Sequence, residues 1–326
     1  MQPVGIQSIE YYLPARTRET DELVKDLDFD RSFLNDKVGI RCRHIAAPEE
    51  AGSDLAVEAA RKLFAKTNLS PDQIGLLIVC TQSPDYQLPH TAALVQKALY
   101  VPSSVASFDI NLGCSGYVYT LAIAKSFMEA QGIHDGLIIT SEIYSKIIDP
   151  QDRGTVAVFG DAAAATWLHS GSPWIAEAFD FGTDGNGYNH LIREAGGSRN
   201  PLPSTDANPF LFMNGREIFN FMMKKVPISV RNCLAKKGLT IEDVDQFVFH
   251  QASQYMLEAL RKRLGIKDNK MMFCLKEVGN TVSSTIPIAL NELWKGPEQP
   301  SNILISGFGV GLSWATALLS RAPAAI

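Results

Sequence analysis

The chain has 326 residues, 46% of them hydrophobic and 20% charged, which is typical of a folded globular protein rather than a disordered one. Its net charge of -5 gives no general attraction to nucleic acid or to an anionic membrane. The start of the chain lacks the basic and then apolar layout of a signal peptide, and no apolar run approaches the ~20 residues that span a bilayer. We therefore expect a cytoplasmic protein that binds neither nucleic acid nor a membrane.

Strand-like and helix-like segments alternate along the chain, and this alternation predicts an α/β fold. Helices with apolar residues at a spacing of three to four are expected at 54–66 and 254–264. The expected strands, which are short apolar runs, are 76–80, 105–110, 136–140, 247–250 and 302–306. The stretch 181–209 is rich in Gly, Pro and Asn and is expected to form a long loop, either between two halves or over a substrate site.

Two parts of the chain resemble each other. Residues 69–83 align without a gap with residues 239–253, and each block has an acid three residues after its first Leu and then enters an apolar strand. Further along, Cys114 falls opposite Asn280, each at a glycine-containing turn between a strand-like and a helix-like run. The alternative is that any two strand–turn–helix units look alike.

The duplication predicts two similar halves, 1–172 and 173–326, packed about a pseudo-twofold axis. Such packing would bring equivalent strand ends together. Cys114, His250 and Asn280 would then converge although they are far apart in the sequence.

Cys114 is the candidate nucleophile. The five cysteines are scattered and lack CxxC spacing, so neither a disulfide framework nor a metal site is expected. Cys114 alone lies at a corner between a strand and a long apolar helix, where free N–H groups and the helix dipole lower the pKa of a thiol. Gly113 and Gly116 would allow an acyl group to approach the backbone there. We predict a thiolate at the end of a buried helix; the alternative is a structural core cysteine.

His250 and Asn280 are the candidate partners of this thiol. His250 alone of the six histidines ends a clear β run, which places it at the carboxyl end of a strand, where ligands of α/β sheets gather. Its Nε2–H, or the imidazolium form, would donate to a developing oxyanion. Asn280 offers amide donors at a similar corner. The alternatives are a hydrogen-bonded core histidine and a helix-capping asparagine.

Five motifs together resemble the β-ketoacyl-acyl carrier protein synthase III family of the thiolase superfamily over the whole chain. They are NLGCSGYVYTLAIA, DRGTVAVFGDAAAATWL, HQAS, VGNTVSSTIPIAL and GFGVGLSWATALL. The resemblance implies the five-layered αβαβα thiolase fold, a homodimer and no cofactor. It also implies a two-step Claisen condensation, in which an acyl-CoA acylates the cysteine and a malonyl thioester, carried by acyl carrier protein (ACP) or coenzyme A, loses carbon dioxide and attacks the acyl group.

The resemblance assigns a role to each candidate. Cys114 is similar to the acylated nucleophile, and His250 and Asn280 to the pair that holds the malonyl carbonyl. The backbone N–H groups of Cys114 and Val310 would meet the oxyanion of the acylation step. Asn280 separates the chain from elongating synthases, which have a second histidine there.

Further positions match the family's substrate-binding residues, namely Phe33, Lys37, Leu88, Arg153, Gly215, Phe219 and Ser253. Phe33 and Lys37 stand where Trp and Arg usually grip the adenine end of coenzyme A, whereas Arg153 is retained. Leu88 replaces a Phe that reaches across the dimer and limits the acyl pocket, and Ser253 replaces an Asn. We therefore expect an acyl group that is longer, branched or otherwise unusual rather than acetyl.

The helix after His250 carries three successive cations, Arg261, Lys262 and Arg263. Near the site they would steer an acidic carrier protein. The alternative is a solvated helix end, where cations complement the helix dipole before Gly265.

Three other functions compete with condensation. A cysteine hydrolase would use the same three residue types as nucleophile, base and orienting group. A thiolase-fold acyltransferase would move the acyl group from Cys114 to a hydroxyl or amine. An inactive partner subunit would be expected to lack the nucleophile, which this chain keeps.

Overall fold

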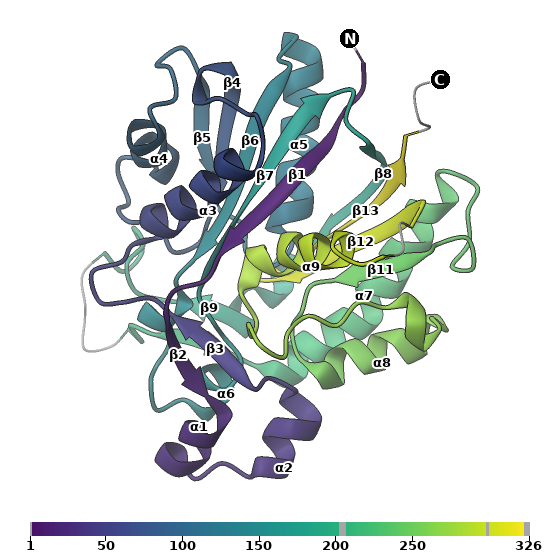
Figure 1. Cartoon of the computed structure of the whole chain (residues 1–326). Coiled ribbons are helices and arrows are strands. Elements are labelled where there is room, and N and C mark those ends of the chain that lie inside the picture. Colours follow the sequence, from purple (N-terminus) through teal and green to yellow (C-terminus); the bar gives the residue numbers. More distant parts are fainter. Residues whose placement is uncertain (1, 202–206, 298–299, 323–326) are drawn as a thin grey trace.

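The computed structural model describes residues 2–201, 207–297 and 300–322 and shows a mixed α/β fold (Figure 1). Its largest sheet has the strand order β11-β12-β13-β8-β1-β7-β6-β4-β5. The left part of this order belongs to the second half of the chain and the right part to the first half. No helix of the described residues is long and apolar enough to cross a membrane.

The first half contributes five strands and covers their outer face with two helices (Figure 1). The strands are β1 (Val4–Tyr12), β4 (Ile74–Cys80), β5 (Ala106–Ile110), β6 (Asp135–Glu142) and β7 (Ala162–Ser170), and the helices are α3 (Gly52–Lys66) and α4 (Thr91–Leu99). Strand β4 is parallel to β5 and β6, whereas β7 is antiparallel to β6 and to β1.

The second half repeats this arrangement at the other end of the strand order. Its strands are β8 (Trp174–Thr183), β11 (Gln246–Phe249), β12 (Asn302–Gly309) and β13 (Ser313–Arg321), and its outer helices are α7 (Gly215–Ala235) and α8 (Gln254–Leu264). Strand β11 is parallel to β12, and β13 is antiparallel to β12 and to β8. The pairs β4/β6 and β11/β12 therefore correspond, and the alignment of residues 69–83 with 239–253 predicts the match of β4 with β11.

Two helices lie between the strands of the first half and the strands of the second half. Helices α5 (Gly116–Gln131) and α9 (Thr285–Trp294) each contact strands of both halves. The order helix, sheet, helix, sheet, helix is the predicted αβαβα arrangement, and the fold prediction is confirmed. The predicted boundary at 172/173 lies in the turn between β7 and β8, and this division stays a prediction.

The remaining elements are short. They are β2 (Arg16–Glu19), α1 (Thr20–Leu27), α2 (Arg31–Phe33), η1 (Leu34–Val38), β3 (Cys42–Ile45), η2 (Pro71–Gln73), η3 (Tyr144–Lys146), α6 (Arg153–Val156), η4 (Gly185–His190), β9 (Leu191–Arg193), β10 (Leu211–Met213), η5 (Asp268–Lys270) and η6 (Val282–Ser284).

Two expectations need correction. Helix α5 is not buried all round, because one flank faces solvent and Ile123 is 40% exposed. The stretch 181–209 is not one continuous loop between the halves, since it includes the end of β8, η4 and β9, which pairs with β10. Residues 202–206 of this stretch lie outside the described residues.

Candidate active site

Cys114 lies between β5 and the start of α5, and its side chain is 7% exposed. Strand β12 passes directly over this corner. A Cβ atom added to Gly309 would lie 3.0 Å from the Cys114 sulfur, and one added to Gly307 would lie 2.3 Å from its carbonyl oxygen. Glycines in β12 therefore allow the two halves to meet at the sulfur.

Burial raises the pKa of the Cys114 thiol well above its usual value, and the nearby Glu142 carboxyl raises it further. A backbone hydrogen bond at the start of the helix lowers the pKa, but by less than burial raises it. The prediction that this corner lowers the thiol pKa is therefore wrong on balance, because loss of solvation outweighs the helix terminus. This direction favours the neutral thiol at Cys114.

His250 directly follows β11 and is 2% exposed. Its backbone N–H donates to Ser306 O over 2.9 Å, and its ring meets the Phe308 ring edge-on, with 5.6 Å between centroids. Burial lowers the pKa of the imidazole to about 3. The imidazole is therefore neutral near pH 7, which removes the imidazolium form from the two donors that the sequence allowed.

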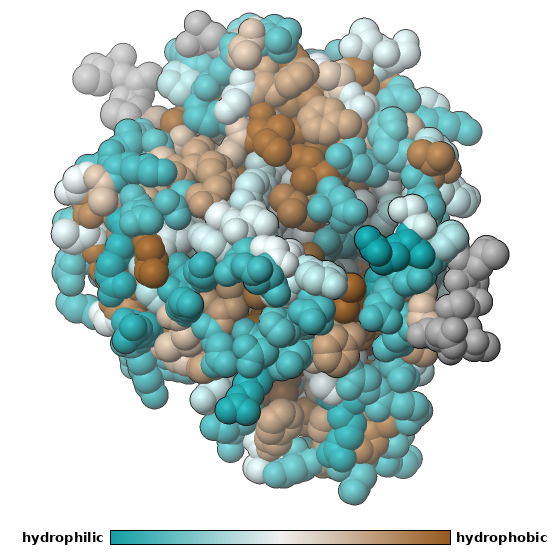
Figure 2. Space-filling model, turned by 180° about the vertical axis from the view of Figure 1, so that it is seen from behind, coloured by the Kyte–Doolittle hydropathy of each residue, from teal (hydrophilic) through white to brown (hydrophobic). Residues whose placement is uncertain are grey.

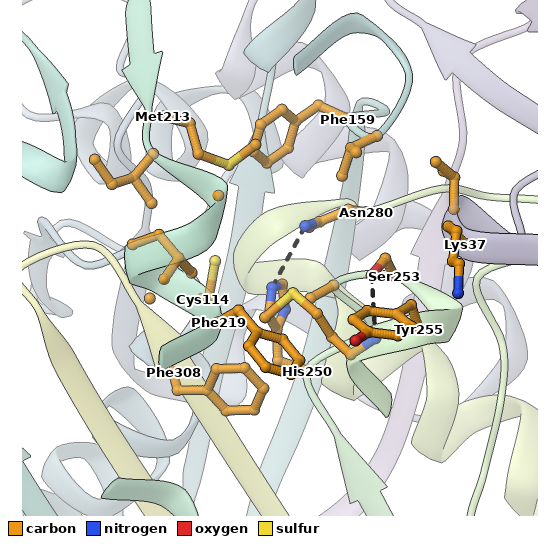
Figure 3. Close-up of a pocket in the computed structure, with 18 of the residues that line it drawn as sticks. Lys37, Cys114, Phe159, Met213, Phe219, His250, Ser253, Tyr255, Asn280 and Phe308 are labelled. Carbon is orange, nitrogen blue, oxygen red and sulfur yellow. Dashed lines mark hydrogen bonds between the residues drawn. The ribbon is translucent and has the colours of Figure 1, made fainter. Parts of the chain in front are cut away.

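Asn280 faces His250 across the pocket (Figure 3), with 3.4 Å between Asn280 Nδ2 and His250 Nε2. Its Oδ1 accepts a hydrogen bond from Val282 N over 2.9 Å, so the amide nitrogen points toward the imidazole. Its backbone pairs with the segment after α6, because Asn280 N donates to Val158 O and Gly160 N donates to Asn280 O, both over 3.0 Å. The position of Asn280 is therefore fixed by its backbone hydrogen bonds, and the orientation of its amide is fixed by the bond at Oδ1.

Thr285, the first residue of α9, links these groups. Its Oγ1 lies 2.8 Å from His250 Nδ1 and donates to Val282 O over 3.0 Å. Val282 has a φ of 54°, which is unusual for a β-branched residue and turns the chain sharply after Asn280. Asn280, His250, Thr285 and Val282 thus form a closed ring of contacts. Strained backbone at such a place is common at functional sites.

Cys114, His250 and Asn280 open into one cavity of about 400 Å³ (Figure 3). Its wall is mainly apolar: Val38, Val158, Phe159, Leu191, Met213, Ile218, Phe219, Met256 and Phe308 line it. Leu191 of β9 lies within the stretch 181–209, so this stretch does contribute to the wall, whereas Met213 of β10 follows it. A buried apolar cavity with three polar groups at its base is typical of a site that binds one small or extended molecule.

Comparison with known proteins agrees with this geometry. Residues 108–185 match the family described as 3-oxoacyl-[acyl-carrier-protein (ACP)] synthase III, and residues 234–321 match its C-terminal part. A β-ketoacyl-[acyl-carrier-protein] synthase III of Caldanaerobacter subterraneus is 37% identical, and the alignment covers 97% of each chain. The chain belongs to the 3-oxoacyl-ACP synthase III family.

Solved structures of this synthase family have the same fold. A crystal structure of a 3-oxoacyl-(acyl-carrier-protein) synthase III superposes with a TM-score of 0.92 at 38% identity, over 98% of this chain and 99% of that one. The enzyme from Thermus thermophilus gives a TM-score of 0.90 at 33% identity, over 98% and 100% of the two chains. The family resemblance noted in the sequence is thereby confirmed.

Five of the seven substrate-binding positions expected from this synthase family line the cavity, and they are Phe33, Lys37, Gly215, Phe219 and Ser253. At the mouth, Lys37 Nζ lies 4.7 Å above the ring of Tyr255, which stacks on Phe219 with 5.4 Å between centroids (Figure 3). Tyr255 therefore forms part of the entrance, together with Lys37 and Phe219.

Leu88 and Arg153 do not line this cavity. Leu88 is 88% exposed, and Arg153 instead lies over the Phe29 ring and donates to Asp28 O over 2.8 Å. Val310 is the residue after Gly309, which lies beside the Cys114 sulfur. The carbonyl of Val310 accepts a hydrogen bond from Ser313 Oγ over 2.9 Å. Its predicted role in oxyanion binding stays a prediction.

Of the three cations on α8, Arg261 is the one that forms ion pairs with other described residues. Arg261 pairs with Glu258 at 2.8 Å and also with Asp268, and its side chain is 15% exposed. Lys262 and Arg263 are exposed.

Sequence reasoning missed Glu142. This carboxyl is fully buried at the end of β6 and accepts hydrogen bonds from Gln82 N, Ser83 Oγ and Ser283 Oγ, of 3.1, 2.8 and 3.1 Å. An acid two residues after the expected strand 136–140 was the available signal. Ser283 belongs to the Asn280 corner, so Glu142 joins the loop after β4 to that corner.

Proposed function

We propose that the chain catalyses the decarboxylative condensation of an acyl group, received from acyl-CoA, with malonyl-ACP, and so makes a β-ketoacyl-ACP. The observation that carries this proposal is the meeting of Cys114, His250 and Asn280 at the base of one apolar cavity. The relatives named as β-ketoacyl-[acyl-carrier-protein] synthase III favour the same reaction. Acyl transfer to a hydroxyl or amine has no comparable support.

In the first step, the sulfur of Cys114 attacks the thioester carbon of acyl-CoA. A bond forms between sulfur and the acyl carbon, the bond to the coenzyme A sulfur breaks, and the thiol proton passes to the departing thiolate. Two backbone donors, Cys114 N–H and Val310 N–H, would stabilise the transient oxyanion. No cofactor or metal is needed for this exchange.

In the second step, Asn280 Nδ2–H and His250 Nε2–H hold the malonyl thioester carbonyl. His250 has its proton on Nε2 when Thr285 Oγ1 turns its own proton from Val282 O to His250 Nδ1. The bond between the malonyl α-carbon and the carboxylate carbon breaks, and carbon dioxide leaves. The electron pair of this bond forms an enolate, whose negative charge lies on the held oxygen. The enolate carbon then attacks the acyl carbon on Cys114, the bond from that carbon to sulfur breaks, and the thiolate takes a proton from solvent when the product leaves. Fixed donors in a cavity from which water is excluded lower the barrier because charge develops where they already point.

Mass spectrometry after incubation with acetyl- through decanoyl-CoA tests the proposal. We expect an acyl adduct on Cys114 that is absent from Cys114→Ala and is discharged by malonyl-ACP with release of carbon dioxide. Discharge by water alone, or by an alcohol or amine, would contradict condensation. The same panel tests the primer: we propose that an acyl group longer than acetyl gives the highest kcat/KM, since Leu88 is smaller than the family's usual Phe.

We propose that Lys262 and Arg263 attract the acidic carrier, because their charges are exposed on α8, the helix that begins beside the cavity-lining Ser253. Arg261 contributes less, because it is already paired with Glu258 and Asp268. Phe33 and Lys37 at the mouth, together with Arg153, would contact the nucleotide end of coenzyme A. Because it would act on these substrates, we also propose that the chain works in the cytoplasm.

We also propose that the chain forms a homodimer. Helix α5 lies at the back of Figure 1, and Figure 2 shows hydrophobic side chains gathered on that face. The exposed flank of α5 with Phe181 of β8 forms a shallow apolar surface made of Tyr119, Ala122, Ile123, Ser126, Phe127 and Phe181. Next to it, β5 ends the sheet and presents an open edge that can pair with a second copy.

A further inference from the structure

Arg43 of β3 is a buried cation to which the proposed reaction assigns no role. Its side chain is 0% exposed, and no ion pair found among the described residues includes it. Burial lowers the pKa of the guanidinium to about 10, so it remains charged near pH 7. A buried charge without a carboxylate partner is costly unless its hydrogen bonds are well satisfied.

Within the described part of the chain, the guanidinium of Arg43 donates to neutral oxygens only. Its Nε donates to Ala157 O over 2.9 Å, and its Nη2 also donates to that oxygen. Its Nη1 donates to Thr20 Oγ1 over 3.0 Å, and Nη2 lies 3.4 Å from Ile40 O. The guanidinium of Arg43 therefore binds the backbone carbonyl of Ala157, directly after the end of α6.

The residues that follow Ala157 are those that hold Asn280. Val158 and Gly160 each make a backbone hydrogen bond of 3.0 Å with Asn280. The stem of Arg43 reaches the other side of the same corner, since a Cβ added to Gly279 would lie 3.2 Å from Arg43 Cγ. Arg43 thus contacts both chain segments that fix Asn280, one through its head and one through its stem.

We propose that Arg43 is a positioning residue for Asn280 and acts on the decarboxylation step rather than on acylation of Cys114. This inference rests on the proposed function. Decarboxylation puts negative charge on the thioester oxygen, and a donor there stabilises it only when held at hydrogen-bond distance. None of the contacts of Arg43 described above involves the corner between β5 and α5, which carries the sulfur.

The two half-reactions test the proposal. In Arg43→Met, which keeps an apolar stem, we expect Cys114 acylation by acyl-CoA within about 2-fold of wild type and condensation with malonyl-ACP slower by at least about 10-fold. Arg43→Lys keeps the charge with fewer donors and should recover part of the lost rate. The change should appear in kcat for condensation more than in KM for malonyl-ACP.

Two further variants separate a positioning role from general damage. Thr20→Val removes the hydroxyl that accepts from Arg43 Nη1, and it should slow condensation selectively, by about 3-fold. Arg61→Met, which removes an exposed cation on α3, should change neither step. Thermal unfolding of each variant establishes that the chain is folded.

Several outcomes would overturn the role of Arg43. Wild-type condensation in Arg43→Met would do so, as would an equal loss of acylation and condensation, or a Thr20→Val chain that condenses normally. A wild-type chain that is never acylated would instead refute the proposed function, so the two failures remain distinct.

Discussion

At the scale of single residues, burial sets the ionisation of the site. Cys114, His250 and Glu142 are all buried, and for each of them the neutral form is favoured. The pKa of Glu142 rises from 4.5 to about 8 because it loses solvent, although serine hydroxyls and backbone N–H groups partly offset this. A neutral cavity floor suits thioesters, which are themselves uncharged at the reacting carbon.

Glu142 should make the stability of the chain depend on pH. Its pKa is about 8 when folded and 4.5 when exposed, so between these values the folded chain binds more protons than the unfolded one. Stability is then lost as pH rises from 4.5 to 8, with a slope of up to about 1.4 kcal/mol per pH unit from this group. Glu142→Gln should flatten this slope.

Urea unfolding of both chains at pH 5.5 and pH 8 measures the difference. Glu49→Gln, which changes an exposed carboxyl, serves as the control and should keep the wild-type slope. Parallel slopes for Glu142→Gln and wild type would mean that the carboxyl titrates at its ordinary pKa.

The sequence predicted the three central residues but not their surroundings. Cys114 and Asn280 were found because each stands at a glycine-containing corner, and His250 because it ends a strand. Glu142 and Thr285 were not, since their roles depend on contacts with residues far away in the sequence, Ser283 in one case and His250 in the other. Such contacts between distant segments leave no periodicity in a single sequence.

At the scale of elements, the site depends on how closely β12 approaches the start of α5. A Cβ added to Gly307 would lie 2.3 Å from Cys114 O, and one added to Gly309 would lie 3.0 Å from its sulfur, so neither position accepts a side chain without a shift. The sequence predicted both elements, because their apolar runs are long, and α8 even begins and ends where expected. It did not predict their separation, since close packing is set by which residues face each other in space.

Gly309→Ala should therefore impair the first half-reaction. Its Cβ would lie 3.0 Å from both Cβ and Sγ of Cys114, so the sulfur must move by a few tenths of an ångström. A displaced nucleophile should be acylated about 10-fold more slowly. The rate of adduct formation on Cys114 by mass spectrometry measures this. Gly185→Ala is the matched control, because no heavy atom lies within 4 Å of its Cβ, and equal rates in both variants would contradict the argument.

At the scale of the whole molecule, the open flank of α5 explains why a helix predicted to be buried is not. Ile123 and its neighbours are apolar because, we infer, a second copy covers them, whereas the described chain leaves them open. The edge strand β5 lies beside this flank, and Phe108 of β5 packs edge-on against Phe127 of α5, with 6.3 Å between ring centroids. One continuous surface thus offers both backbone pairing and apolar contact.

Ile123→Glu should weaken the proposed dimer. A charge introduced into an apolar interface must lose its hydration when the copies associate, so the dissociation constant should rise by at least about 10-fold. Sedimentation velocity over a range of concentrations measures this. Ile228→Glu is the matched control, because Ile228 is an exposed isoleucine on α7, on the outer layer of the second half. A wild-type chain that sediments as a monomer at every concentration, or equal dissociation constants for Ile123→Glu and the control, would contradict this interface.

Since Leu88 is 88% exposed in the single chain, its proposed effect on the acyl group also requires the second copy, and the preference among acyl-CoAs should weaken together with the dimer.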